Sequence, residues 1–446
     1  MLELYGDLLY NDTIFCIGGL ILEKENIKTA LSDGLTGINI NTSKFKTVRT
    51  AVCFILPVNK ENVACASLLS KLLCRSTADY PTPKALRERL NFLYGAELSA
   101  STVRCGDNMI LKFSSISVCD KYALSDEGVT AKVCELLKSA IFNPNVKDGA
   151  FCEEDFRVEK RLVIEEIRAL INEKRSYAVT KALEKMCHDE PFGIIRDEKT
   201  VEAVTPQGLF DFWKNLLETA PVYIINIGEN DPEPIFRSFK SSFDLLDRRP
   251  AQIKSEFSPI IPQKTKEFSE QMEISQGKLV MGFRTEVSSA SHNIAPLRVM
   301  TDIFGGAPYS KLFTVVREKM SLCYYCAARL YSVKGIVCVD SGIEIENLKA
   351  AEKGITDQLE LIQKGEFDEE IINASKIGLS DAVRSVEDTS GGIESWYVMR
   401  LLDKQLTTPT EFIRDINAVT KEDIINAAKG VRLDTVYVLK GKEGEN

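Results

Sequence analysis

Histidine is scarce in this chain, which contains only His188 and His292 among its 446 residues. Neither belongs to a His-x-x-Glu-His pattern, in which two imidazoles share one face of a helix. A catalytic zinc ion takes three protein ligands, and two isolated histidines cannot supply them. We therefore expect both residues on the surface or in loops, and we expect no metal and no other cofactor.

Excess positive charge and long apolar runs are also missing. The net charge is −9 and the pI is near 5.2, whereas nucleic-acid-binding domains usually have a pI above about 9. No apolar run approaches the roughly 18 residues of a membrane span. The segment from Met1 to Tyr10 carries Glu3 and Asp7 and lacks the basic region of a secretory signal. We expect a cytoplasmic protein with no nucleic-acid or membrane partner.

Cysteine, in contrast, is common. The twelve cysteines are scattered, mostly within apolar stretches, which is typical of reduced, buried thiols in the cytoplasm. Cys323 and Cys326 form a C-x-x-C pattern, which can be redox-active or provide half of a zinc site. Because this pattern lies in a predicted strand, residues i and i+3 should point to opposite faces. We favour two separate core cysteines whose thiols do not meet.

Two distant stretches of the chain follow the same template. An Arg-Glu pair precedes a tyrosine by the same seven positions at Arg87 and Tyr94 and again at Arg317 and Tyr324. A second repeat is Ala-Val-Thr, which occurs at 203–205 and at 418–420 and is followed each time by a helical stretch and an apolar strand. Repeats of this kind predict a duplicated architecture.

Length agrees with two domains, because single cores stop growing at roughly 250–300 residues. The least periodic segment contains Pro250 and Pro262 among interspersed charges, which break helix and strand patterns. We predict one domain at 1–245, an extended linker at 246–270 and a homologous domain at 271–446.

Each half alternates strand and helix patterns in a mixed order. The predicted class is α+β, with a mostly antiparallel sheet and helices on one face in each domain, and the two domains facing each other as a clamshell. Strands are expected at 48–57, 109–118, 278–284, 322–330 and 336–343, and helices at 62–73, 84–92, 155–172, 294–304 and 310–319.

The run from Phe304 to Phe313, with Arg317-Glu318-Lys319 and Tyr324 after it, resembles the insulinase or pitrilysin-type (inverzincin) metallopeptidases. The resemblance covers essentially the whole chain and includes the Asp79-Tyr80-Pro81-Thr82 segment. It implies a small bacterial member of that family.

Active members place His-x-x-Glu-His on a helix of the first half, where two histidines bind zinc and the Glu deprotonates the bound water. The resemblance places Ser67 and Lys71 at the histidine positions and Ser70 at the position of the general base. Glu166 matches the third ligand, although a solvated or capping carboxylate is the alternative. We expect this degenerate zinc site to be replaced by a Lys71–Glu166 ion pair, with the side chains within about 5 Å.

The resemblance also implies that Arg317 and Tyr324 reach the substrate backbone and the scissile carbonyl, where a hydroxyl can stabilise a developing oxyanion. The alternative is that both serve only the fold, since Arg87 and Tyr94 repeat their spacing. Tyr325 adjoins Tyr324 and would point to the opposite face of the strand.

The sequence thus favours a peptidase homologue that is inactive on its own. We predict the non-zinc partner subunit of a heterodimeric peptidase, paired with a zinc-bearing paralogous subunit or with itself, which contributes substrate-binding Arg317 and Tyr324. The alternative is a non-catalytic peptide-binding or scaffolding clamshell that holds extended chains by β-strand addition. An independent peptidase with a rearranged site is disfavoured, because too few ligands exist.

Overall fold

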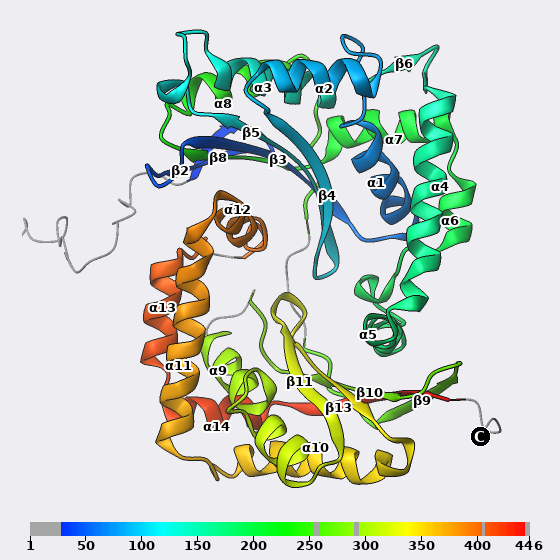
Figure 1. Cartoon of the computed structure of the whole chain (residues 1–446), viewed down its shortest axis with the longest axis vertical. Helices are drawn as coiled ribbons and strands as arrows, with labels where there is room; N and C mark the ends of the chain where they lie inside the picture. Colours follow the sequence, from blue (N-terminus) through cyan, green and yellow to red (C-terminus); the bar gives the residue numbers. More distant parts are fainter. Residues whose placement is uncertain (1–27, 254–258, 290–293, 404–405, 442–446) are drawn as a thin grey trace, which may run out of the picture.

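The structure is a computed structural model that describes residues 28–253, 259–289, 294–403 and 406–441. The beginning of the chain with Cys16, and also His292, lie outside the described residues. The predicted α+β class is confirmed, and two open sheets face each other across the molecule (Figure 1). Within the described part, no helix is long and apolar enough to cross a membrane.

The first sheet has six strands, and all neighbours are antiparallel except β2 and β8. In spatial order they are β1 (Lys28–Ser32), β2 (Leu35–Asn41), β8 (Val222–Gly228), β3 (Thr47–Pro57), β5 (Asn108–Val118) and β4 (Glu97–Cys105). A separate two-stranded ribbon pairs β6 (Val146–Lys147) with β7 (Ala150–Phe151).

The second sheet repeats this topology in five strands. Its order is β11 (Cys323–Tyr331), β12 (Ile336–Ile343), β10 (Gly277–Arg284), β13 (Arg432–Lys440) and β9 (Lys266–Gln271), with β13 and β9 parallel. When the strands β2, β3, β4, β5 and β8 are matched in chain order to β9 through β13, both sheets have the same neighbours and the same orientations. This is the pattern that a duplication produces.

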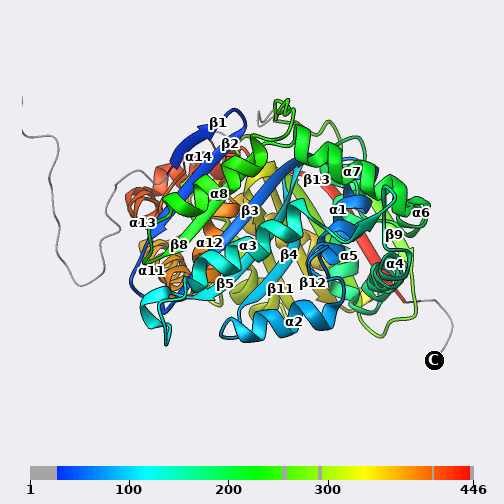
Figure 2. The ribbon, with the colours of Figure 1, turned by 90° about the horizontal axis from the view of Figure 1, so that it is seen from above.

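Most helices cover the outer faces of the sheets (Figures 1 and 2). The first half contains α1 (Lys60–Leu72), α2 (Pro83–Phe92), α3 (Val129–Phe142), α4 (Glu153–Ala169), α5 (Lys174–Met186), α6 (Glu198–Ala203), α7 (Pro206–Thr219) and α8 (Glu233–Phe243). The second half contains α9 (Ile294–Gly305), the π-helical η4 (Leu312–Lys319), α10 (Leu348–Gln363), α11 (Glu369–Arg384), α12 (Ser390–Val398), α13 (Pro409–Ala418) and α14 (Lys421–Lys429).

Strand β3 shows why its sequence is apolar without alternation. Val52, Phe54 and Leu56 pack into the outer core with the first-half helices. Ala51 and Ile55 point the other way, into a core that continues into the second half. Because both faces of the strand are covered, every position from 51 to 56 is buried. The two halves therefore share one apolar core, and the first half has a further core of its own.

One helix from each half lies against the inner face of the other half's sheet. Ala178 and Ala182 of α5 pack against Val280, Cys338 and Tyr437 of the second sheet. Helix α12, from the second half, packs against β3 and β8 of the first sheet. Figure 1 shows both helices between the two sheets. This exchange departs from the expectation that all helices lie on one face, because the inner faces also need an apolar cover.

A buried carboxylate fixes α12 to the first sheet. Glu394, whose side chain is 3% exposed, accepts from Arg49 Nη1 at 3.0 Å and is paired with Lys112 Nζ at 3.0 Å. Ser114 Oγ donates to the other carboxylate oxygen. All three partners come from β3 and β5 of the first half. One carboxylate is thus shared by two cations where the halves meet.

A second charged cluster joins the halves near β10. Glu190, in the first half, pairs with Arg284 and, at 2.7 Å, with Lys334 Nζ. Lys334 also binds Asp107 at 2.8 Å, and Arg284 binds Asp434 at 3.3 Å. Burial raises the pKa of the Glu190 carboxyl, but the hydrogen bonds and charges of Arg284 and Lys334 outweigh it and hold this pKa below its ordinary value of 4.5.

Removing the Glu394 charge should destabilise the closed molecule. In Glu394→Gln, Arg49 and Lys112 lose their counter-charge in a buried site, at a cost of about 3 kcal/mol in the free energy of unfolding. The matched control is Glu387→Gln, which removes a more exposed pair with Lys44 at 3.2 Å and should cost less than about 1 kcal/mol. Denaturant titration measures both, and equal losses would contradict the role given to Glu394.

The Glu190 cluster predicts an acid-sensitive contribution to stability. Since the pKa of Glu190 is lowered by folding, its stabilisation is fully present above pH 4.5 and is lost as the pH falls through the lower, folded-state pKa. The difference in unfolding free energy between the natural chain and Glu190→Gln should therefore shrink toward zero on acidification. Exposed Glu88→Gln should change that energy by less than about 0.5 kcal/mol. A Glu190 effect that grows at low pH would be the wrong sign.

Candidate functional site

Of the four first-half positions that the resemblance assigns to the zinc site, Ser67, Ser70 and Lys71 lie on α1. Asn59 caps this helix by accepting from the Asn62 backbone N–H at 2.7 Å. Ser67 and Ser70 face inward, and their hydroxyls donate to the carbonyl oxygens of Val63 at 2.7 Å and of Ser67 at 2.8 Å. Both hydroxyls are therefore satisfied within the helix and are not directed at a common point.

The predicted ion pair between α1 and α4 is present. Lys71 Nζ lies 2.8 Å from Glu166 Oε1, and Arg196 Nη2 lies 3.3 Å from Glu166 Oε2. Partial burial raises the pKa of the Glu166 carboxyl, but the hydrogen bonds and charges of Lys71 and Arg196 hold it below its ordinary value. Because both side chains of the pair are about two-fifths exposed, the ion pair contributes at most about 1 kcal/mol to the free energy of unfolding.

These donors do not fit a zinc ion. An ammonium has no lone pair at neutral pH and would repel a dication, and Lys71 occupies one side of the Glu166 carboxylate while Arg196 occupies the other. In the described part of the chain, no group of three or more His, Cys, Asp and Glu side chains is arranged to hold a metal. We derive no metal-dependent step from this site.

A second charged group on the same helix pair was missed by the sequence reasoning. Arg75, just beyond α1, donates to Asp155 and to Glu159 of α4, both at 2.7 Å. Glu159 lies seven residues before Glu166, so two helical turns place both on the face of α4 that meets α1. That spacing, together with the four-position offset from Lys71 to Arg75, was the available signal. The α1–α4 contact is thus held by salt bridges along its length.

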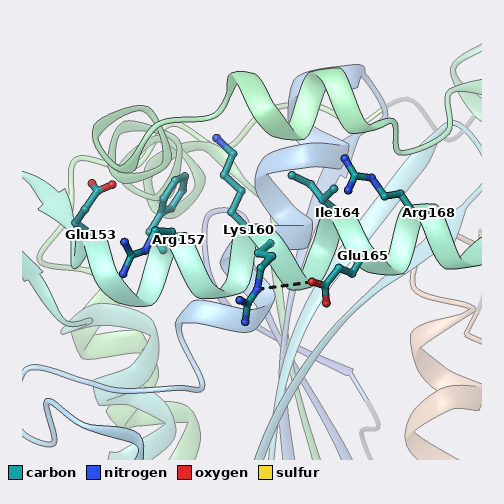
Figure 3. Close-up of a pocket in the computed structure, with 8 residues that line it drawn as sticks. Glu153, Arg157, Lys160, Ile164, Glu165 and Arg168 are labelled. Atoms are coloured by element: carbon teal, nitrogen blue, oxygen red, sulfur yellow. Dashed lines mark ion pairs between the residues drawn. The ribbon is translucent and has the colours of Figure 1, made fainter.

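The opposite face of α4 borders a shallow groove of about 490 Å³ (Figure 3). Its lining is rich in cations, but Lys160 donates to the carbonyls of Glu202 and Val204 and Arg168 pairs with Glu198. These contacts tie α4 to the helix α6. The groove is therefore separated by the helix itself from Glu166 and belongs to the packing of α4.

The second-half candidates lie around η4 and the start of β11. The helix expected at 310–319 is present but is wound more widely, with Met320 N–H bonded to the Val315 carbonyl at 2.8 Å, and π-helical turns are frequent at functional sites. The half-buried Arg317 places its guanidinium over the Phe313 ring at 4.2 Å. Tyr324 is 65% exposed, so its hydroxyl is free to meet a ligand.

The two copies of the repeated Arg-Glu…Tyr pattern occupy different positions relative to the following strand. Tyr94 has a positive φ of 60° in the turn before β4, and its hydroxyl donates to Glu127 at 3.0 Å. Tyr324 lies inside β11, and the corresponding left-handed residue of the second half is Ser321, with φ of 53°. The equal spacing in sequence therefore does not translate into equal positions, and only Tyr324 is exposed to this degree.

The expectation for the C-x-x-C pattern was wrong. Strand β11 has a bulge, since Cys323 pairs with Ile343 and Tyr325 with the next residue, Gly342, which leaves Tyr324 as the extra residue. The bulge resets the alternation of the strand, so Cys323 and Cys326 point to the same face of the sheet. Uniform alternation could not have predicted this. Tyr325 points to the other face, with its ring 4.3 Å from the Arg175 guanidinium.

Of the two histidines, His188 is as exposed as expected. Its imidazole Nδ1 lies 2.9 Å from Asp189, and its side chain is 78% exposed. The two groups of candidate residues lie in different halves, with Ser67, Ser70, Lys71 and Glu166 in the first and Arg317 and Tyr324 in the second.

These observations define a duplicated, two-domain, peptidase-like fold in which the described residues form no group of three metal ligands. The family model for the peptidase M16 inactive domain matches residues 203–379. The probable inactive metalloprotease YmfF of Bacillus subtilis (strain 168) is 31% identical over 414 residues, which are 92% of this chain and 97% of that protein. The chain belongs to the M16 peptidase family, which confirms the resemblance inferred from the sequence.

Solved structures agree with the fold. A conserved protein from Enterococcus faecalis V583 has 28% identity and a TM-score of 0.86, and the match covers 94% of this chain and 99% of that one. The peptidase M16 inactive domain from Pseudomonas fluorescens has 15% identity and a TM-score of 0.76, with coverage of 94% and 99%.

Rebuilding the motif tests the assignment of the site. The triple variant Ser67→His, Ser70→Glu and Lys71→His restores His-x-x-Glu-His on α1, and we expect it to retain about one zinc ion per chain, with Glu166 as the third ligand. Zinc is measured by elemental analysis after dialysis, with circular dichroism as the check on folding.

The control adds Glu166→Gln to the triple variant and should lower the affinity for zinc at least about 10-fold. A folded triple variant that binds no zinc, or that binds it equally well without Glu166, would show that the assigned positions do not converge.

Proposed function

We propose that this chain is the non-zinc subunit of a two-chain M16-type peptidase. In this proposal a zinc-bearing paralogous subunit supplies the metal, and this chain supplies Arg317 and Tyr324 to the peptide substrate. The observation that carries it is the unequal state of the two halves. The first-half positions are closed by the Lys71–Glu166 ion pair, whereas Tyr324 in the second half is exposed.

The chemistry of the second-half residues fits a supporting role toward a peptide. A guanidinium can donate to peptide carbonyls, and its position on Phe313 restricts its motion. A phenol hydroxyl can donate to an oxyanion that develops on the scissile carbonyl. Neither group can activate water by itself, so turnover in this proposal requires the partner's metal site.

We further propose domain bounds, a cellular location and an oligomeric state for the chain. The first domain extends to residue 245, the linker spans 246–270 and the second domain spans 271–446. The last helix of the first half ends at Phe243, whereas the first strand of the second half begins at Lys266, within the proposed linker. We place the protein in the cytoplasm as a heterodimer, with a self-dimer as the other outcome.

A scaffolding clamshell is the second candidate, and one observation favours it. Strands β4 and β11 each form one edge of their sheet, and an edge strand can bind an extended peptide through its backbone. Such a protein would need neither the Arg317 guanidinium nor the Tyr324 hydroxyl.

Reconstitution with a partner separates the two candidates. We expect peptide cleavage only when this chain is mixed with a zinc-bearing paralogue from the same genome. The double variant Arg317→Ala, Tyr324→Phe should assemble with the partner but lose turnover by about 100-fold or more, since removing one oxyanion donor costs roughly that factor. Size-exclusion chromatography measures assembly, and a fluorogenic peptide measures turnover.

The matched control is Arg87→Ala, Tyr94→Phe, which alters the first-half pair with the same spacing and should leave turnover within about threefold of the natural chain. If the chain forms no complex with any paralogue and gives no cleavage with any of them, the partner-subunit proposal is wrong. A complex whose activity is indifferent to Arg317 and Tyr324 would favour the scaffold.

A further inference from the structure

The bulge at Tyr324 assembles a thiol site that uniform alternation would have kept apart. Cys323 is half-buried at the start of β11, and Cys326 on the same strand is 4% exposed. Because Cys323 is opposite Ile343 and Cys326 is opposite Ser341, the two thiols and the Ser341 hydroxyl share one face of the sheet. The Ser341 hydroxyl also donates to the Tyr325 carbonyl at 2.8 Å.

These neighbours favour the thiolate form of Cys323. The hydrogen bond with Cys326 lowers the pKa of the Cys323 thiol, burial opposes it, and Ser341 and the charge of Arg317 add to the lowering, which brings this pKa to about 7. The same contact, with burial, raises the pKa of the Cys326 thiol. Cys326 therefore keeps its proton and acts as the donor.

The remaining groups near the pair do not supply a second nucleophile. Arg317 comes from η4, and the groups across the sheet are Tyr325, Arg175 of α5 and Asp340 of β12. Burial raises the pKa of the Tyr325 phenol to about 12, so it is neutral near pH 7. Arg317 is the neighbouring cation that acts on the Cys323 sulfur.

We propose that Cys323 is a site of reversible covalent modification by small organic disulfides, with Cys326 on the same face of the strand as the hydrogen-bond donor that stabilises its thiolate. The Cys323 thiolate attacks one sulfur of the disulfide X–S–S–X. A Cys323–S–S–X bond forms, the X–S–S–X bond breaks, and X–S⁻ leaves and takes a proton from water. The thiol sulfur is oxidised, the departing X–S⁻ is reduced, and reduction by any free thiol reverses the step.

The rest of the chain offers few competitors among the described cysteines. Most of the others are buried. Burial raises the pKa of the half-buried Cys74 to about 12, so its thiol is protonated near pH 7. Cys152, at the start of α4, is half-buried like Cys323 and serves as the internal reference. The adduct would stand beside the exposed Tyr324 without requiring that Tyr324 bind a peptide.

The expected reaction rate of Cys323, relative to an ordinary thiol, follows from two opposing effects. A thiol with a pKa near 7 is about half ionised at pH 7, roughly 50-fold more than one at the ordinary 9.0, whereas its lower basicity reduces nucleophilicity by roughly 8-fold. The net expectation is a rate about fivefold above that of an ordinary thiol of equal access.

The test treats the full chain, in a Cys16→Ser background, with 2-hydroxyethyl disulfide. Peptide mass mapping of acid-quenched samples follows the adduct at each cysteine across the pH range from about 5 to 10. We expect Cys323 to react about fivefold faster than Cys152 at pH 7, with a rate midpoint near pH 7, and we expect a free thiol to remove the adduct. Cys323→Ser should abolish this fast reaction, and Cys152→Ser should retain it.

Two substitutions of Cys326 distinguish stabilisation of the Cys323 thiolate from simple solvent access to the Cys323 sulfur. Cys326→Ala removes the donor and should move the midpoint up by about one pH unit or more, whereas Cys326→Ser keeps a donor and should leave it near 7. A midpoint near 9 in the natural chain, or no change in the folded Cys326→Ala variant, would overturn the proposal. Failure of the partner-subunit assay would not affect either result.

Discussion

The buried Glu394 carboxylate is the contact on which the arrangement of the two halves depends. It neutralises Arg49 and Lys112 at once, so the inner face of the first sheet is compatible with burial only while α12 of the second half lies on it. Helix α5 makes the reciprocal contact with the second sheet, and the Glu190 cluster adds charge pairing at another point. The inner face of each sheet is therefore covered by a helix that the other half supplies.

In the first half, charge pairing of this kind also holds α1 against α4. The α1–α4 contact requires some pairing for Glu166, and Lys71 with Arg196 provides it, while the more buried Asp155 and Glu159 are held by Arg75. Charge balance between the helices is kept, and the described residues form no group of three metal ligands. In the second half, Tyr324 is exposed and Arg317 is positioned by Phe313.

The sequence predicted the features that depend on local pattern. The strand at 48–57 and the helices at 62–73 and 84–92 correspond closely to β3, α1 and α2, and the Lys71–Glu166 contact followed from the resemblance. The features it missed depend on tertiary packing or on one inserted residue. The inner positions of α5 and α12 follow from the shared core, and the bulge at Tyr324, one residue long, reverses the direction in which the following side chains point.

The most direct test of the account is the metal content and the activity of the purified chain alone. Elemental analysis after dialysis against zinc should find no stoichiometric zinc, and the chain alone should give no peptide hydrolysis that a chelator abolishes. One zinc ion bound per chain, together with chelator-sensitive hydrolysis, would contradict the conclusion that Lys71 and Arg196 have taken the place of a metal at Glu166.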